Sequence, residues 1–115
     1  MQYVMLVYQG DAQDRQAALS EQEQAQVYAD YRAIAETAGV TTMPPLGTAE
    51  DATTVRVRNG AILTTDGPFV GMKEAIGSVF VFEADDLDAA IELAARVPAA
   101  RYGGAVEIRP SAVYW

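Results

Sequence analysis

The amino-acid sequence predicts an α+β fold: a ferredoxin-like βαββαβ sandwich with an extra β-hairpin. Three observations predict it. Apolar segments rich in β-forming residues alternate with two amphipathic segments of helical period, and an Asn-Gly pair separates two strand-like runs. The resulting order, β-α-β-hairpin-β-α-β, places two helices on one face of a mostly antiparallel sheet. The 115 residues suffice for one core, so we expect residues 1–115 to form a single domain.

The N-terminal part predicts a strand, a loop and a helix. Residues 3–8 are a short apolar run, which is typical of a central strand. Residues 10–18 are polar and irregular, and we expect a surface loop there. Ser20 and Glu23 have the spacing of a capping box, and Gly39 suits the C-terminal end of the helix that follows. Its apolar stripe consists of Val27, Tyr31, Ile34 and Ala38.

The middle of the chain predicts an edge strand and a hairpin. Residues 41–47 are interrupted by Pro44 and Pro45, which confines a strand there to a sheet edge. Asn59-Gly60 between residues 53–58 and 61–65 is a strong signal for a two-residue hairpin turn. The cross-strand pairs expected from such a turn are Arg58 with Ala61, Val57 with Ile62, and Arg56 with Leu63.

The C-terminal part predicts a strand, a second helix and a last strand. Residues 77–83 are apolar and strand-like, and Asp85 or Asp86 is the expected N-cap of a helix that ends at Pro98. Residues 105–110 form the last strand, with Val106 and Ile108 on one face. The stripe expected on the second helix consists of Leu87, Ala90, Ile91, Ala94 and Val97.

The composition excludes several classes of function. The formal charge of −8 argues against a nucleic acid or an anionic membrane as partner. Without His or Cys there can be no Ser-His-Asp triad, thiol nucleophile or thiolate zinc site, so chemistry would depend on carboxylates, Lys, Tyr, Arg or backbone amides. No spacing favours a metal, and no cofactor is expected. The start of the chain does not resemble a signal peptide, and we expect a cytoplasmic protein.

The predicted layout leaves one face of the sheet without helices. An apolar sheet face is most simply covered by the same face of a second copy, so we expect a homodimer. The apolar residues 112–115 lie where chains usually fray, and we expect them to dock, with the dimer interface as one location.

The segment from Thr65 to Phe69, followed by Lys73-Glu74, resembles the signature of the DGPF group of YCII-related proteins. The similarity extends to residues 3–8, to residues 53–56 with the Asn59-Gly60 turn, and to residues 87–90, 98–101 and 106–110. It implies a dimeric α+β barrel with a cleft near the Asp-Gly-Pro-Phe loop that binds or converts small molecules. Some members of the group are encoded beside sigma-factor genes, which implies a regulatory alternative.

Two positions depart from that pattern. Met72 stands where the group commonly has Thr, and the His-Asp pair of many YCII-related proteins has no counterpart in a chain without His. A mechanism that depends on this pair cannot be transferred to the chain.

The loop itself contains the first candidate site residues. Asp66 is either a turn-forming carboxylate or a catalytic acid/base, and Gly67-Pro68 shape the backbone around it. Lys73 and Glu74 are either a solvated ion pair or part of a ligand site, where Lys73 would attract an anion.

Three further candidates lie outside the charged part of the loop. Phe69 is either a core residue or a ligand platform, and Arg56 is either a solvated residue or a carboxylate clamp in a dimer cleft. Tyr8 is either a core tyrosine or a hydrogen-bond donor to a ligand.

Three functions follow from these candidates. The first is a cofactor-free enzyme of isomerase or lyase type that uses Asp66 on a small anionic or aromatic ligand. The second is a non-catalytic sensor with the same cleft. The third is a regulatory interaction partner in a sigma-factor-associated pathway.

Overall fold

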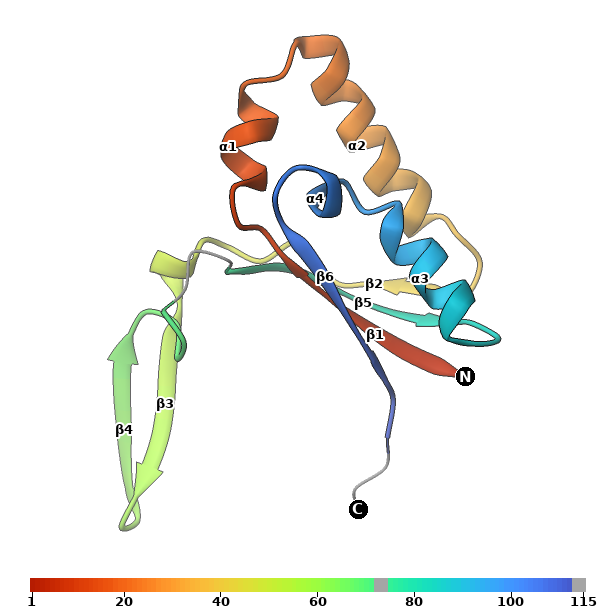
Figure 1. The fold of residues 1–115 in the computed structure, drawn as a ribbon. Helices are drawn as coiled ribbons and strands as arrows, with labels where there is room; N and C mark the ends of the chain where they lie inside the picture. Colours follow the sequence, from red (N-terminus) through yellow and green to blue (C-terminus); the bar gives the residue numbers. More distant parts are fainter. Residues whose placement is uncertain (72–74, 113–115) are drawn as a thin grey trace.

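A computed structural model describes residues 1–71 and 75–112 of the chain. It confirms a mixed α+β fold with antiparallel sheets, in which the helices lie on one side of a four-stranded sheet and a separate hairpin projects away from it (Figure 1). The elements in chain order are β1 (Gln2–Tyr8), α1 (Ala12–Ala17), α2 (Glu21–Ala35), β2 (Val40–Thr42), η1 (Ala49–Asp51), β3 (Thr53–Arg58), β4 (Ala61–Asp66), β5 (Ile76–Glu83), α3 (Leu87–Ala95), α4 (Pro98–Arg101) and β6 (Ala105–Pro110).

The larger sheet has the strand order β2-β5-β1-β6, and each neighbouring pair is antiparallel. Successive side chains along β1 point to opposite faces, so Tyr3, Met5 and Val7 are buried beneath the helices. Phe80 and Phe82 from β5 lie on the same face, and the Phe82 ring stacks on Tyr3 with 5.7 Å between centroids. We call this sheet with its helices the body.

The opposite face of the body carries no helix (Figure 1). Its central residues come from β1 and β5, are only half buried, and form the cross-strand pairs Val4 with Val81 and Leu6 with Val79. On the neighbouring strand, Glu107 pairs with Leu6 and Arg109 with Val4. We call the apolar residues Val4, Leu6, Val79 and Val81 the helix-free face.

The helices begin where the capping signals predict. Ser20 Oγ accepts a hydrogen bond from the Glu23 backbone N–H at 3.2 Å, and Asp86 caps α3 by accepting from Ala89 N–H at 2.9 Å. The predicted stripe of α3 is partly wrong. Leu87 and Ile91 are about half exposed, while Ala90, Leu93 and Ala94 are buried.

Two short helices were not predicted. The first is α1, which lies within the expected loop at 10–18 and whose Ala12 is fully buried. The second is α4, which follows α3 and has Pro98 as its first residue, a position that proline favours. These helices pack on one another, so tertiary contact stabilises segments whose sequence carries little helical periodicity. Ala38 of the predicted α2 stripe is exposed, because the helix ends at Ala35.

Strands β3 and β4 form a hairpin that we call the arm, residues 53–66. Its register pairs Arg58 with Ala61, Val57 with Ile62 and Arg56 with Leu63, as predicted, and Asn59 and Gly60 both have positive φ. The arm leaves the body as a two-stranded ribbon with exposed apolar residues, Ile62 at 74% exposure among them. The radius of gyration is 16.0 Å, against about 13 Å for a compact domain of this length.

Among the described residues, no helix is long and apolar enough to cross a membrane.

The contact between α2 and α4 predicts a pH dependence of stability. Arg101 Nη2 lies 2.6 Å from Asp30 Oδ2, and hydrogen bonds from Gln26 and then Arg101 hold the pKa of Asp30 below its ordinary value of 3.8. Because the pKa of Asp30 is lower in the folded state than in the unfolded state, its ionised carboxylate stabilises the folded protein at pH values above the unfolded-state pKa. This stabilisation is lost as the pH falls through the pKa of the folded state. We therefore expect Asp30→Asn to flatten the loss of stability below about pH 4 in urea denaturation. Asp85→Asn, at an exposed position, is the control, and an equal effect of both variants would contradict this assignment.

Candidate functional site

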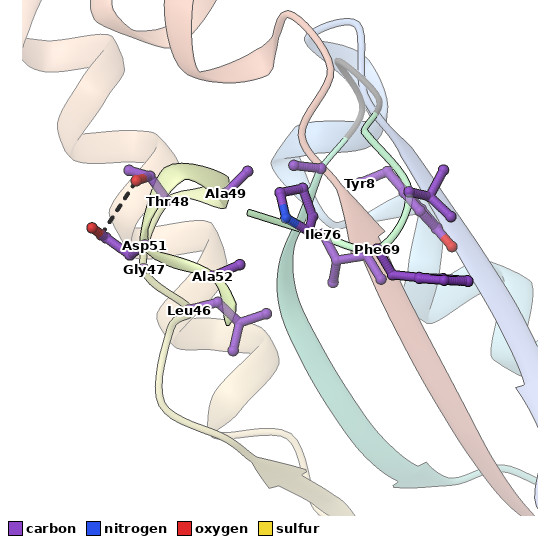
Figure 2. Close-up of a pocket in the computed structure, with 12 residues that line it drawn as sticks. Tyr8, Leu46, Gly47, Thr48, Ala49, Asp51, Ala52, Phe69 and Ile76 are labelled. Carbon is purple, nitrogen blue, oxygen red and sulfur yellow. Dashed lines mark hydrogen bonds between the residues drawn. The ribbon is translucent and has the colours of Figure 1, made fainter. Parts of the chain in front are cut away.

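A cavity of about 590 Å³ lies between the body and the base of the arm (Figure 2). The described parts of the chain that meet around it are the end of β1, the connection that leads through η1 to β3, residues 68–70 after β4, and residues 75–76 at the start of β5. The lining residues are Tyr8, Leu46, Gly47, Thr48, Ala49, Asp51, Ala52, Pro68, Phe69, Val70, Ala75 and Ile76.

Apolar side chains face one another across this cavity. Figure 2 shows Leu46, Ala49 and Ala52 on one wall, and Ile76 and Phe69 on the other. The polar side chains on the first wall turn outward, where Thr48 Oγ1 donates a hydrogen bond to Asp51 Oδ2 at 3.3 Å. The arrangement suits an apolar molecule, because the inward-pointing groups offer surface contact and few hydrogen bonds.

Backbone hydrogen bonds hold the two walls in place. Leu46 N–H donates to the Gly77 carbonyl at 3.1 Å, which fixes the first wall to the start of β5. Gly67 N–H donates to the Ala52 carbonyl at 2.7 Å, and the Thr54 hydroxyl donates to the Gly67 carbonyl at 2.7 Å. Gly67 adopts φ +98°, a conformation that disfavours any residue with a Cβ atom. These bonds close the base of the arm beside the cavity.

Two of the predicted site residues line the cavity. Tyr8 comes from the end of β1 and is half buried, and its hydroxyl donates to Glu107 Oε1 over a long 3.4 Å. Phe69 is 70% exposed, so the expectation of a core phenylalanine is wrong, and its ring lies at the wall of the cavity. Their predicted contacts with a ligand stay predictions.

Arg56 and Asp66 occupy different places around this cavity. The Arg56 guanidinium carbon lies 5.5 Å from the centroid of the Phe69 ring, so this arginine lies next to the cavity lining. Asp66 is exposed at the end of β4, where it pairs with Thr53, and it is not a lining residue. Within the described part of the chain its carboxylate forms no hydrogen bond, and both of its predicted roles stay predictions. Lys73 and Glu74 lie outside the described residues, as do residues 113–115 of the tail.

The sequence interpretation missed the wall formed by residues 46–52. These residues follow Pro44-Pro45 and contain Leu46, Ala49 and Ala52, three apolar residues between polar ones, which was the available signal. Across the ranges 1–71 and 75–112, no three acidic side chains gather as they would around a metal ion.

In the comparison with protein families, a family model described as the YCII-related domain matches residues 1–112. It confirms the resemblance to YCII-related proteins over nearly the whole chain, while the narrower DGPF group stays a prediction. No curated protein matches the chain.

The geometry at Gly67 predicts a backbone-specific cost of substitution. A Cβ atom at Gly67 would meet open space, so Gly67→Ala should destabilise the protein only through its positive φ, by about 1–2 kcal/mol. Gly71→Ala is the control, because Gly71 has equal space and no positive φ. Urea denaturation of both variants measures the difference. Equal stability of the two would contradict the proposed strain.

Proposed function

The chain belongs to the YCII-related family, and we propose that it binds a small, largely apolar molecule in the cavity between body and arm. The cavity carries this proposal. Its volume of about 590 Å³ lies within the range of small-molecule sites, and its facing walls consist of apolar side chains. Phe69 supplies an accessible aromatic ring at the wall, which suits a ligand that is itself aromatic.

The same geometry favours binding over proton transfer. A catalytic acid/base must come within hydrogen-bonding reach of the reacting atom. Asp66 does not line the cavity, and the Asp51 side chain turns away from it toward Thr48. The isomerase or lyase hypothesis with Asp66 is therefore the less supported of the two. The regulatory alternative in a sigma-factor-associated pathway predicts a contact patch and no cavity, so the cavity favours a ligand binder over it as well.

We further propose that two copies associate through their helix-free faces as a dimeric α+β barrel. The strand order β2-β5-β1-β6 is that of a ferredoxin-like sheet, in which the last strand lies beside the first. The accessible surface is 8050 Å², whereas a compact monomer of 12.3 kDa has about 6,100 Å². The excess is comparable to what one protomer buries in a large, stable dimer.

Filling the cavity should abolish binding. Ala49 faces the cavity, and Ala49→Phe places a phenyl ring in the space that the ligand needs. Calorimetric titration with small aromatic compounds should give binding to the wild type and none to this variant. Ala61→Phe, at an exposed position near the tip of the arm, should bind like the wild type. Binding that survives in Ala49→Phe would place the ligand elsewhere.

A charge on the helix-free face should separate the protomers. Leu6→Glu would bury an additional carboxylate opposite Glu107, which already pairs with Arg109, so we expect the variant to sediment as a monomer where the wild type sediments as a dimer. Leu87→Glu makes the same change at an exposed position at the start of α3 and should leave the dimer intact. A monomeric wild type, or a dimeric Leu6→Glu variant, would refute the proposed interface.

A further inference from the structure

Arg56 places a positive charge beside a cavity whose lining is mostly apolar, with Tyr8, Thr48 and Asp51 as its polar residues. It belongs to β3, and its guanidinium carbon lies 5.5 Å from the centroid of the Phe69 ring, which lines the cavity. A cation over an aromatic ring is attracted by the ring quadrupole. The contact engages the charge of the guanidinium and leaves N–H groups available as donors, since a guanidinium has five of them.

Arg56 has no carboxylate partner within the described residues, although acidic side chains outnumber basic ones by 16 to 8. Other arginines of this chain do have such partners. Arg101 lies 2.6 Å from Asp30, and Arg109 Nε lies 2.5 Å from Glu107 Oε2. In a chain with a net charge of −8, a guanidinium that contacts a ring instead of a carboxylate is well placed to receive an anionic group from outside.

From its position beside the cavity, Arg56 would contact the charged end of a bound ligand, whereas the apolar walls would contact the rest of the molecule. Leu46, Ala49 and Ile76 offer apolar contact on the walls. Arg56 is not a lining residue; it is exposed on the arm and lies next to Phe69. A molecule with an apolar body and one charged end would therefore bury the body and keep the charge at the solvent-exposed edge. That placement avoids the cost of burying a charge.

We propose that the cavity takes a small aromatic carboxylate, whose ring packs against Phe69 and whose carboxylate accepts hydrogen bonds from Arg56. This proposal rests on the proposed ligand-binding function and names the class of ligand. Arg56 acts as the anion-binding residue because carboxylate and guanidinium match in shape and charge. The negative charge of the whole chain opposes anions in general, so selectivity for a carboxylate depends on this local group.

The test compares two ligands of equal shape and two variants of equal charge. The ligands are phenylacetate and the neutral phenylacetamide. The variants are Arg56→Gln and Arg58→Gln, which each remove one positive charge from the arm. Arg58 lies two residues farther along β3 toward the turn, on the same face as Arg56. Calorimetric titration at low ionic strength measures all six affinities, and thermal melting checks that each variant is folded.

We expect the wild type to bind phenylacetate at least about tenfold more tightly than phenylacetamide, as charge-assisted hydrogen bonds allow. Arg56→Gln should lose this preference while retaining affinity for phenylacetamide, and Arg58→Gln should keep the preference.

Three results would overturn the inference. Equal affinity of the wild type for both ligands would show a binding cavity without an anion site. An equal loss in both variants would assign the preference to the overall charge of the arm. The third result is that neither ligand binds the folded wild type. It would refute the proposed function together with this inference, whereas the first two results would refute this inference alone.

Discussion

Hydrogen bonds between distant backbone segments determine where the cavity lies. Leu46 is hydrogen-bonded to Gly77 and Ala52 to Gly67, so the connection before β3 is held against the start of β5 at one end and against the residue that follows β4 at the other. Gly67 has a positive φ at this point, and the Thr54 hydroxyl donates a hydrogen bond to its carbonyl. The segment from Leu46 to Ala52 forms one wall of the cavity. Phe69, two residues after Gly67, belongs to the opposite wall.

A single chain leaves much apolar surface in contact with water. Part of it is the helix-free face, and part is the arm, where Val57 and Ile62 pair across the strands and are both exposed. A two-stranded ribbon is at best marginally stable alone, so the packing of a second surface on the arm would stabilise its folded conformation. The proposed dimer would account for the helix-free face and for the exposed arm together.

Local signals in the sequence were sufficient for most of the fold. The capping box at Ser20 and the Asn59-Gly60 turn depend on neighbouring residues alone, and both were predicted correctly. The helices α1 and α4 escaped prediction because their stability comes from packing on one another. The residues of the site were harder to predict, because their positions also depend on contacts between distant parts of the chain. Tyr8 and Phe69 were candidate residues and both line the cavity. The wall at 46–52 had only the weak signal of its three spaced apolar residues, because its position depends on hydrogen bonds to Gly77 of β5 and to Gly67 after β4.

The most direct test of the account is a map of where an aromatic carboxylate binds to the wild-type protein. Backbone amide resonances followed in a phenylacetate titration provide that map without any substitution. We predict that the largest shifts occur at residues 46–52 and at Phe69, Val70, Ala75 and Ile76, with a smaller response at Arg56. Saturable shifts confined to another surface, such as the groove between α3 and the end of β5, would contradict it.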